Sequence, residues 1–176
     1  MRARATAGCH GRGVKVYLTL NIFAYDEDIE PLGDLAKYAV RACGVDALIM
    51  ADPGAIAAVM DALPEAEIHL STQMSTMNAR AVRFWHDAGI KRVVLSRAVS
   101  LARIKALRAA IPQRCALEAF VHGAVSMSYS GRCTLSTYLP GRHANRRDSP
   151  PACPSPSLLA AHQRPVQSSP VDDTDR

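Results

Sequence analysis

The amino-acid sequence predicts an α/β fold in which one parallel sheet is built from about five consecutive strand–helix units. Short runs rich in Val, Ile and Leu alternate with longer segments in which apolar residues recur at helical spacing. Each repeat of this alternation is ~22 to 30 residues long, which suits parallel strands joined by right-handed helical crossovers. Polar residues stand where each apolar run stops, and this edge of such a sheet is where binding sites form.

The expected elements follow one another in a regular order. We expect strands at 14–21, 46–50, 67–73, 92–96 and 117–123, and helices at 27–44, 53–64, 76–89 and 100–111. Pro53 opens one helix, and Gly89 ends another. Five such units fit a flavodoxin-like open sheet, and they equally fit a partial TIM-like (β/α) barrel. The chain has 176 residues, short of the ~250 that a complete barrel usually needs.

Three segments differ in composition. Residues 1–12 form a basic flank and residues 141–176 a tail rich in Pro, Ser and Arg, and we expect disorder in the first and in most of the second. Residues 13–140 form the predicted barrel-type domain. This middle is nearly neutral, so the net charge of +5 is weak support for nucleic-acid binding. Five cysteines without a signal peptide indicate a reducing compartment, and we expect a cytoplasmic protein without a membrane segment.

Candidate ligand-binding residues lie at the carboxyl ends of the expected strands. We single out Asn21, Gln73, Arg97 and His122, because a guanidinium and an amide at one edge suit a carboxylate or phosphate. Other polar residues at this edge, Asp52, Ser96 and Ser100, are interpreted as helix caps.

The remaining expectations concern structural residues. His69 alternates with Ile68 and Leu70, so we interpret it as a structural histidine on the opposite face of its strand. Residues expected in the core are Phe84, Trp85, Leu101, Ile104 and Leu107, together with the thiols of Cys43 and Cys115.

Residues 118–148 carry the most specific pattern in the chain. The residues that form this pattern are, in chain order, Glu118, Phe120, His122, Gly123, Met127, Tyr129, Ser130, Gly131, Arg132, Cys133, Leu135, Ser136 and Tyr138. This segment resembles the signature of the peptidase U32 family, and the resemblance extends over roughly residues 13–148. It is most similar to the branch that hydroxylates the wobble uridine of tRNA.

The resemblance implies a barrel-type α/β domain and one of two activities. These are prephenate-linked hydroxylation of tRNA uridine or, as the alternative, collagenase-like proteolysis. The implied catalytic residues are His122, Tyr129, Arg132 and Cys133. Intact relatives are expected to carry a [4Fe–4S] cluster on cysteines.

The chain departs from the family pattern at the expected cluster ligands. Ser126 and Ser149 stand where cysteines are expected, which leaves Cys133 and Cys153 as an incomplete set of metal ligands. A cubane normally needs four thiolates, so we expect no cluster to be bound here. We interpret the flanks as truncated or frame-shifted and expect impaired activity.

Three further expectations follow from this interpretation. Open barrel edges would favour homo- or hetero-oligomers, because unpaired strands present free backbone groups. The partner would be tRNA or another RNA. The chain could also be an inactive remnant, or an RNA-binding fragment whose basic N-terminus and Arg142, Arg146 and Arg147 contact phosphate.

Overall fold

The computed structural model describes residues 3–122, 157–161 and 164–168. The chain divides into two compact units, residues 1–120 and residues 121–176. The first unit contains the sheet and all five α-helices of the described residues. In the second unit, the described strands β6 (Ser157–Ala161) and β7 (Arg164–Ser168) form an antiparallel pair, within a tail for which the sequence predicts mostly disorder.

The first unit is one parallel sheet of five strands in the order in which they occur in the chain. The strands are β1 (Tyr17–Leu20), β2 (Ala47–Met50), β3 (Ile68–Leu70), β4 (Arg92–Val94) and β5 (Ala116–Glu118). Each strand pairs in parallel with the next. A flavodoxin-like sheet would need the order 2-1-3-4-5, so this alternative is wrong, and the order is that of consecutive barrel units.

Helices follow the strands as the sequence predicts. They are α2 (Asp26–Lys37), which continues into a π-helical turn η1 (Tyr38–Ala42), α3 (Pro53–Ala62), α4 (Ala79–Asp87) and α5 (Leu101–Ala110). Asp52 caps α3 by accepting a hydrogen bond from the N–H of Ala55 at 2.8 Å, as expected. Ser100 occupies the N-cap position of α5 without a side-chain cap bond.

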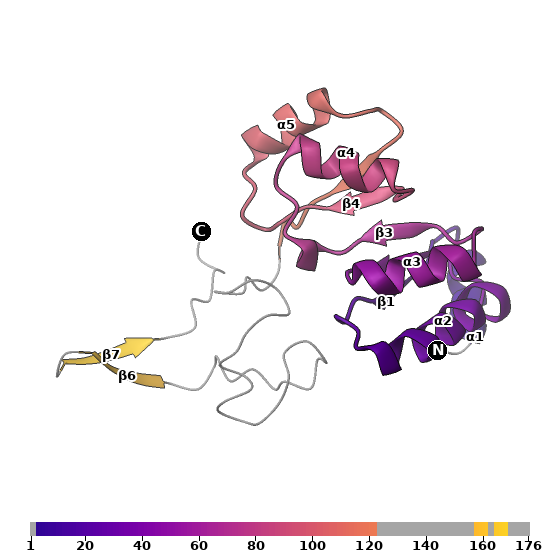
Figure 1. The fold of residues 1–176 in the computed structure, drawn as a ribbon. Coiled ribbons are helices and arrows are strands. Elements are labelled where there is room, and N and C mark those ends of the chain that lie inside the picture. The colour runs from indigo at the N-terminus through magenta and orange to yellow at the C-terminus, as the bar shows by residue number, and fades with distance from the viewer. Residues whose placement is uncertain (1–2, 123–156, 162–163, 169–176) are drawn as a thin grey trace. The chain divides into compact units, whose positions relative to one another are not determined.

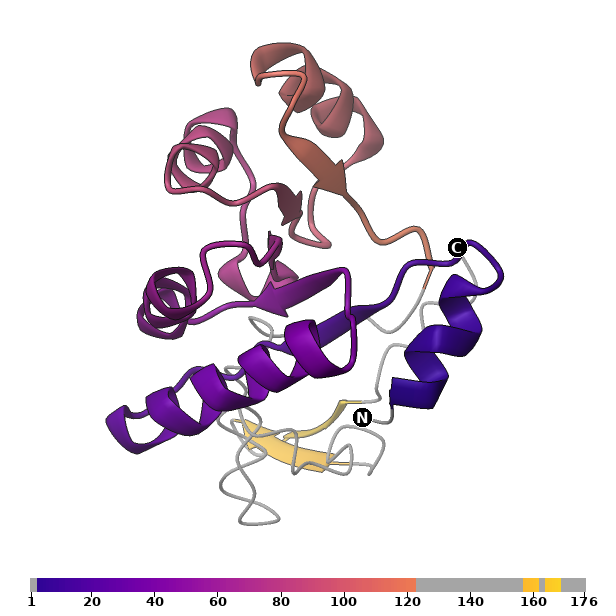
Figure 2. The same ribbon diagram turned by 90° about the vertical axis from the view of Figure 1, so that its right-hand side faces the viewer.

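The helices α2 to α5 cover one side of a curved sheet (Figures 1 and 2). Alternate strand residues form the core against them, and these are Leu20, Leu48, Met50, Ile68, Leu70, Val93 and Leu95. They pack with helix residues such as Leu32, Ile56, Val59, Val82 and Leu107. Cys43 and Cys115 are buried, as predicted. Because one face of the sheet packs on helices, the other face, which we call the inner face, is left for polar side chains.

Two expected core residues lie on the surface instead. Phe84 is 65% exposed and Leu101 is 73% exposed, while their helices bury Val82 and Leu107. Trp85 packs against the core as expected. Since consecutive helical residues are turned by about 100°, the core takes Trp85 and leaves Phe84 in solvent.

The N-terminal flank contains an element that the sequence analysis missed. Residues expected to be disordered form α1 (Ala3–His10), in which Thr6 is buried. The carboxylate of Asp46 links α1 to β1, because its Oδ2 accepts a hydrogen bond from the N–H of Val16 at 2.7 Å and lies 2.9 Å from Nε2 of His10. These contacts, the Val16 amide first, lower the pKa of Asp46 below its ordinary value. The alanines of this segment favour a helix. The segment lacks apolar residues at helical spacing, so the sequence analysis did not identify this helix.

None of the helices in the described residues has the length and apolar composition needed to cross a membrane.

Candidate functional site

The inner face of the sheet carries charged and aromatic side chains. Strand register aligns His69 of β3 with Arg92 of β4, and Val94 of β4 with Glu118 of β5. Because strand side chains alternate, Tyr17, His69, Arg92 and Glu118 lie on the face opposite the buried leucines. This placement of His69 is the one predicted from the sequence.

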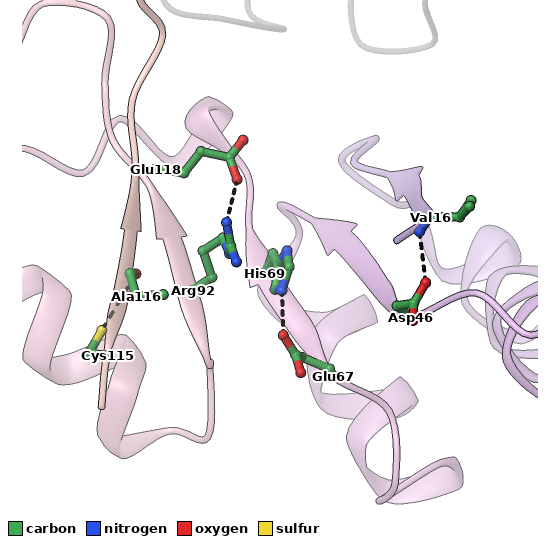
Figure 3. A network of polar contacts seen from close by, with 8 residues as sticks. All are labelled: Val16, Asp46, Glu67, His69, Arg92, Cys115, Ala116 and Glu118. Carbon is green, nitrogen blue, oxygen red and sulfur yellow. Dashed lines mark hydrogen bonds and ion pairs between the residues drawn. The ribbon is translucent and has the colours of Figure 1, made fainter. Parts of the chain in front are cut away.

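These side chains contact one another across the strands. Arg92 pairs with Glu118 at 3.3 Å, and its guanidinium lies 5.7 Å from the centre of the Tyr17 ring. The buried His69 meets that ring edge-on, and its Nε2 lies 2.8 Å from Oε1 of Glu67. Figure 3 shows the contact between His69 of β3 and Glu67 beside the ion pair between Arg92 of β4 and Glu118 of β5. The inner face is therefore an ordered polar surface that leads to the carboxyl edge of the sheet.

One residue beyond the paired part of the sheet, Asn21 and Ser71 join the ends of β1 and β3. Nδ2 of Asn21 donates a hydrogen bond to Oγ of Ser71 at 3.2 Å, and both residues are buried. The intervening strand carries Ala51 at this level, and its small side chain leaves room for a contact across β2. Asn21 therefore lies at the edge of the sheet, where the sequence predicts it, and is held by a partner that the prediction did not identify.

The segment after β3 turns sharply instead of continuing as a strand. Ser71 caps the short 3₁₀ helix η2 (Thr72–Met74), and Ser75 adopts a left-handed conformation with φ 50°. Thr72 donates a hydrogen bond to the carbonyl of Leu95 at 2.9 Å, which ties this turn to the end of β4. The turn buries Gln73, and among the described residues its Oε1 has no hydrogen-bond partner.

Arg97 and Phe120 extend the same edge over β4 and β5. The guanidinium carbon of Arg97 lies 4.3 Å from the centre of the Phe120 ring, a close cation–π contact. Phe120 is 48% exposed, so about half of its surface remains accessible. We call Asn21, Ser71, Gln73, Arg97 and Phe120 the rim cluster. It presents an amide, a guanidinium and an aromatic ring at the edge where ligands bind in parallel α/β sheets.

The implied catalytic residues lie mostly beyond the described part of the chain. Tyr129, Arg132, Cys133 and Cys153 fall outside the described residues, as do Ser126, Ser149 and the tail arginines Arg142, Arg146 and Arg147. His122 is described as an exposed residue after β5, in the second unit. Of the predicted site residues, the structure thus places Asn21, Gln73 and Arg97 at one edge of the sheet, and leaves the catalytic assignments as predictions.

Sequence reasoning missed several residues of this surface. The sequence analysis assigns Phe120 only to a motif, and it does not identify Ser71, Arg92 or Tyr17 as site residues. Their signal is the strand alternation itself: each occupies the parity opposite to the buried apolar residues. Arg92 and Glu118 could therefore have been assigned to the inner face from sequence.

The three histidines of the first unit contact carboxylates or an arginine, and none forms a hydrogen bond with a described Ser or Cys side chain that could act as a nucleophile. His10 and His69 contact Asp46 and Glu67, and Nε2 of His86 accepts a hydrogen bond from Nε of Arg114 at 2.9 Å. No group of three or more His, Cys, Asp or Glu side chains within residues 3–122 is arranged to hold a metal ion. Burial raises the pKa of the Cys115 thiol, which makes this cysteine less reactive.

Comparison with known families gives one match that covers almost the whole chain. The model of peptidase family U32 matches residues 3–169, a wider span than the resemblance at 13–148 seen in the sequence.

Curated relatives match this chain over only part of their own length. The chain is 41% identical over 134 residues to tRNA hydroxylation protein P1 of Bacillus subtilis, which covers 76% of this chain and 31% of that protein. It is 36% identical over 159 residues to the 23S rRNA 5-hydroxycytidine C2501 synthase of Escherichia coli, covering 90% of this chain and 23% of that protein. The chain thus spans less than a third of these relatives.

Among solved structures, the U32 peptidase Mk0906 superposes with a TM-score of 0.52. The match covers 66% of this chain and 49% of that chain, at 14% sequence identity. At this identity, the likeness supports the fold alone.

Proposed function

Because this chain belongs to peptidase family U32, we propose that it retains, in the rim cluster, the small-molecule site of an RNA-hydroxylating protein, while its own turnover is impaired. Two relatives support the RNA part, since one is named for tRNA hydroxylation and the other for 5-hydroxycytidine synthesis in 23S rRNA. The chain spans only part of both, so the activity, substrate and partners of the whole protein belong to this proposal.

The arrangement of Arg97, Phe120 and Gln73 carries the ligand assignment. The guanidinium carbon of Arg97 lies 4.3 Å from the centre of the Phe120 ring, and a guanidinium is the side-chain group best suited to bind a carboxylate with two hydrogen bonds. Oε1 of Gln73 is buried without a hydrogen-bond partner among the described residues, and a hydroxyl or amine of the same ligand would satisfy it on entering this edge. A small carboxylate with a hydroxyl group satisfies both.

The finer proposal names prephenate as this ligand and uridine in tRNA as the modified base. Prephenate carries two carboxylates and a hydroxyl group, so its functional groups suit Arg97 and Gln73. Asn21 and Ser71 hold the edge in place through their mutual hydrogen bond, and Phe120 shields one face of the guanidinium from water. These residues bind and orient the ligand.

The cysteines suggested by the family pattern do not fit a [4Fe–4S] cluster. A cubane needs about four thiolates, whereas Cys133 and Cys153 supply two, and a neutral serine hydroxyl is a poor ligand for iron. We therefore derive no step through a cluster and propose that turnover by this chain is impaired. Anaerobic reconstitution with iron and sulfide should leave the protein colourless; brown protein with visible Fe–S absorption would contradict this.

Calorimetric titration with prephenate and a turnover assay test the proposal together. We expect prephenate to bind the full chain and Arg97→Gln to weaken binding by at least tenfold, about 1.4 kcal/mol, as for loss of a charged hydrogen bond. Arg41→Gln is the matched control, because it removes the same charge from an exposed pair with Glu65. Mass spectrometry of digested tRNA should show no hydroxyuridine formed by the chain alone.

Each outcome has a separate meaning. Equal prephenate affinity in the wild type and in Arg97→Gln would refute the rim cluster as the ligand site. Hydroxyuridine formed by this chain alone would refute impaired turnover. Cleavage of gelatin, lost in Cys133→Ala, would replace RNA hydroxylation by the peptidase alternative.

A further inference from the structure

Charge is strongly segregated along the folded unit, although residues 13–140 as a whole are nearly neutral. Residues 13–78 contain three Lys or Arg and ten Asp or Glu, whereas residues 79–114 contain nine Lys or Arg and a single acid, Asp87. The first stretch comprises β1 to β3 with α2 and α3, and the second comprises α4, β4 and α5. One end of the sheet is thus acidic on its helical side, and the other is basic.

Most cations of the basic stretch are exposed. Three arginines of this stretch contact groups within the fold. Arg92 forms an ion pair with Glu118, and Arg97 contacts the Phe120 ring. Arg108 donates hydrogen bonds to backbone carbonyls of the segment before β5. The exposed cations of this stretch are Arg80, Arg83, Lys91, Arg103, Lys105 and Arg114. None of these six takes part in an ion pair among the described residues. Arg83 and Arg114 donate hydrogen bonds to the carbonyl of Ala110 and to His86, but no carboxylate of the described residues neutralises the charge of any of the six.

Helical geometry brings three of these arginines to the junction of α4 and α5. Arg83 of α4 donates a hydrogen bond to the carbonyl of Ala110 at the end of α5, so this side chain bridges the two helices. Arg103 is seven residues, about two turns, before Ala110 and lies on the same flank of α5. Arg80 is one turn before Arg83 on α4. Figures 1 and 2 show α4 and α5 as neighbours on the outer side of the sheet.

An exposed aromatic ring lies within this basic surface. Phe84 is 65% exposed and stands one turn after Arg80 on α4. Trp85 packs against the core and contacts the Phe84 ring edge-on, with ring centres 5.3 Å apart. This contact supports the exposed Phe84 ring from the protein side. A large apolar ring beside arginines is a costly surface for a protein that has no partner there, and it is a platform on which nucleic-acid bases stack.

We propose that Arg80, Arg83, Arg103, Lys105 and Phe84, the α4–α5 surface, bind RNA by contacting backbone phosphates and stacking one unpaired base. The choice of RNA among polyanions rests on the proposed function. Arg80 and Arg103 lie in the first turns of their helices, which begin at the carboxyl edge of the sheet. RNA on this surface therefore lies beside the rim cluster. The acidic side chains of α2 and α3 repel RNA from the opposite end of the sheet.

Binding of fluorescein-labelled bulk bacterial tRNA to the full chain, measured by anisotropy over a range of salt concentrations, tests the surface. The test variant is Arg80→Gln/Arg103→Gln/Lys105→Gln, which spares Arg83 because its guanidinium holds α5. Losing three phosphate contacts should weaken binding by at least about tenfold and reduce the slope of log Kd against log salt by about two to three.

Two matched variants remove the same charge elsewhere. Lys15→Gln/Lys37→Gln/Arg41→Gln changes the acidic end, and Arg142→Gln/Arg146→Gln/Arg147→Gln changes the tail. Both should bind tRNA within about twofold of the wild type. Equal losses in all three variants would show general attraction of a polyanion, and loss only in the tail variant would move the site there; either result overturns the proposal.

Phe84 gives an independent readout that does not depend on charge. Phe84→Ala should weaken binding of an unpaired oligouridine by about fivefold or more without changing the salt slope, as stacking on one base requires. Leu101→Ala, which removes a similarly exposed apolar side chain from α5, should have no effect. Prephenate binding should survive in every variant. Wild-type protein that binds prephenate but no RNA would refute this surface and the RNA part of the proposed function, while leaving the rim cluster intact.

Discussion

Truncation of Leu70 to alanine tests how the sheet packs on its helices. Leu70 is fully buried in the central strand β3, directly before the rim residue Ser71, and its side chain belongs to the core shared with α2 to α5. Removing three carbon groups at ~0.8 kcal/mol each costs about 2.4 kcal/mol in transfer free energy. A cavity between the sheet and its helices adds to this, so we expect a loss of about 3 to 4 kcal/mol in the free energy of unfolding.

Urea unfolding followed by circular dichroism measures this loss. At a slope of about 1–3 kcal/mol/M, the midpoint should fall by about 1 to 4 M. Leu101→Ala removes the same atoms from a side chain that is 73% exposed, and it should change the free energy by less than about 0.5 kcal/mol. If Leu70→Ala does not fold, Leu70→Val should still lower the midpoint. Similar shifts for Leu70→Ala and Leu101→Ala would refute the assigned packing.

Two further predictions concern titratable groups. The pKa of Asp46 is lowered chiefly by the N–H of Val16, so its contribution to stability is complete above the ordinary value of 3.8 and is lost as the pH falls below it. Asp46→Ala should therefore lower the melting temperature at pH 7, and the melting temperatures of variant and wild type should converge near pH 2. A constant difference in melting temperature over this range would contradict the assignment. Burial raises the pKa of the Cys115 thiol, so iodoacetamide at pH 7.5 should alkylate the partly exposed Cys9 first, as peptide mass spectrometry would show; faster labelling of Cys115 would mean that β5 opens readily.

The sequence predicts the strand and helix order well because each element has a strong local signal. The boundaries differ where tertiary contacts decide them. The strand expected at 67–73 ends at Leu70, because Ser71 accepts a hydrogen bond from the N–H of Gln73 and starts η2 instead. The predicted polar edge thus has the right residues, but only the structure shows that Asn21 is paired with Ser71 and that Gln73 is buried.

Errors in the surface assignments have a common physical cause. Apolar character alone placed Phe84 and Leu101 in the core, although the buried residues on the same helices, Val82 and Leu107, define faces that exclude them. Averaging charge over residues 13–140 hid its segregation in the same way. The sequence alone shows that acidic residues dominate before residue 78 and basic residues after it. Only the structure shows that the exposed cations lie on neighbouring helices.

The central claim is that the edge formed by Gln73, Arg97 and Phe120 is a ligand site. Its most direct measurement is the change in the Phe120 ring signals in an NMR titration of the full chain with prephenate, with Arg97→Gln as the comparison. We predict saturable shifts of these signals in the wild type that are lost in the variant. Signals that do not move, or that move equally in both proteins, would contradict the claim.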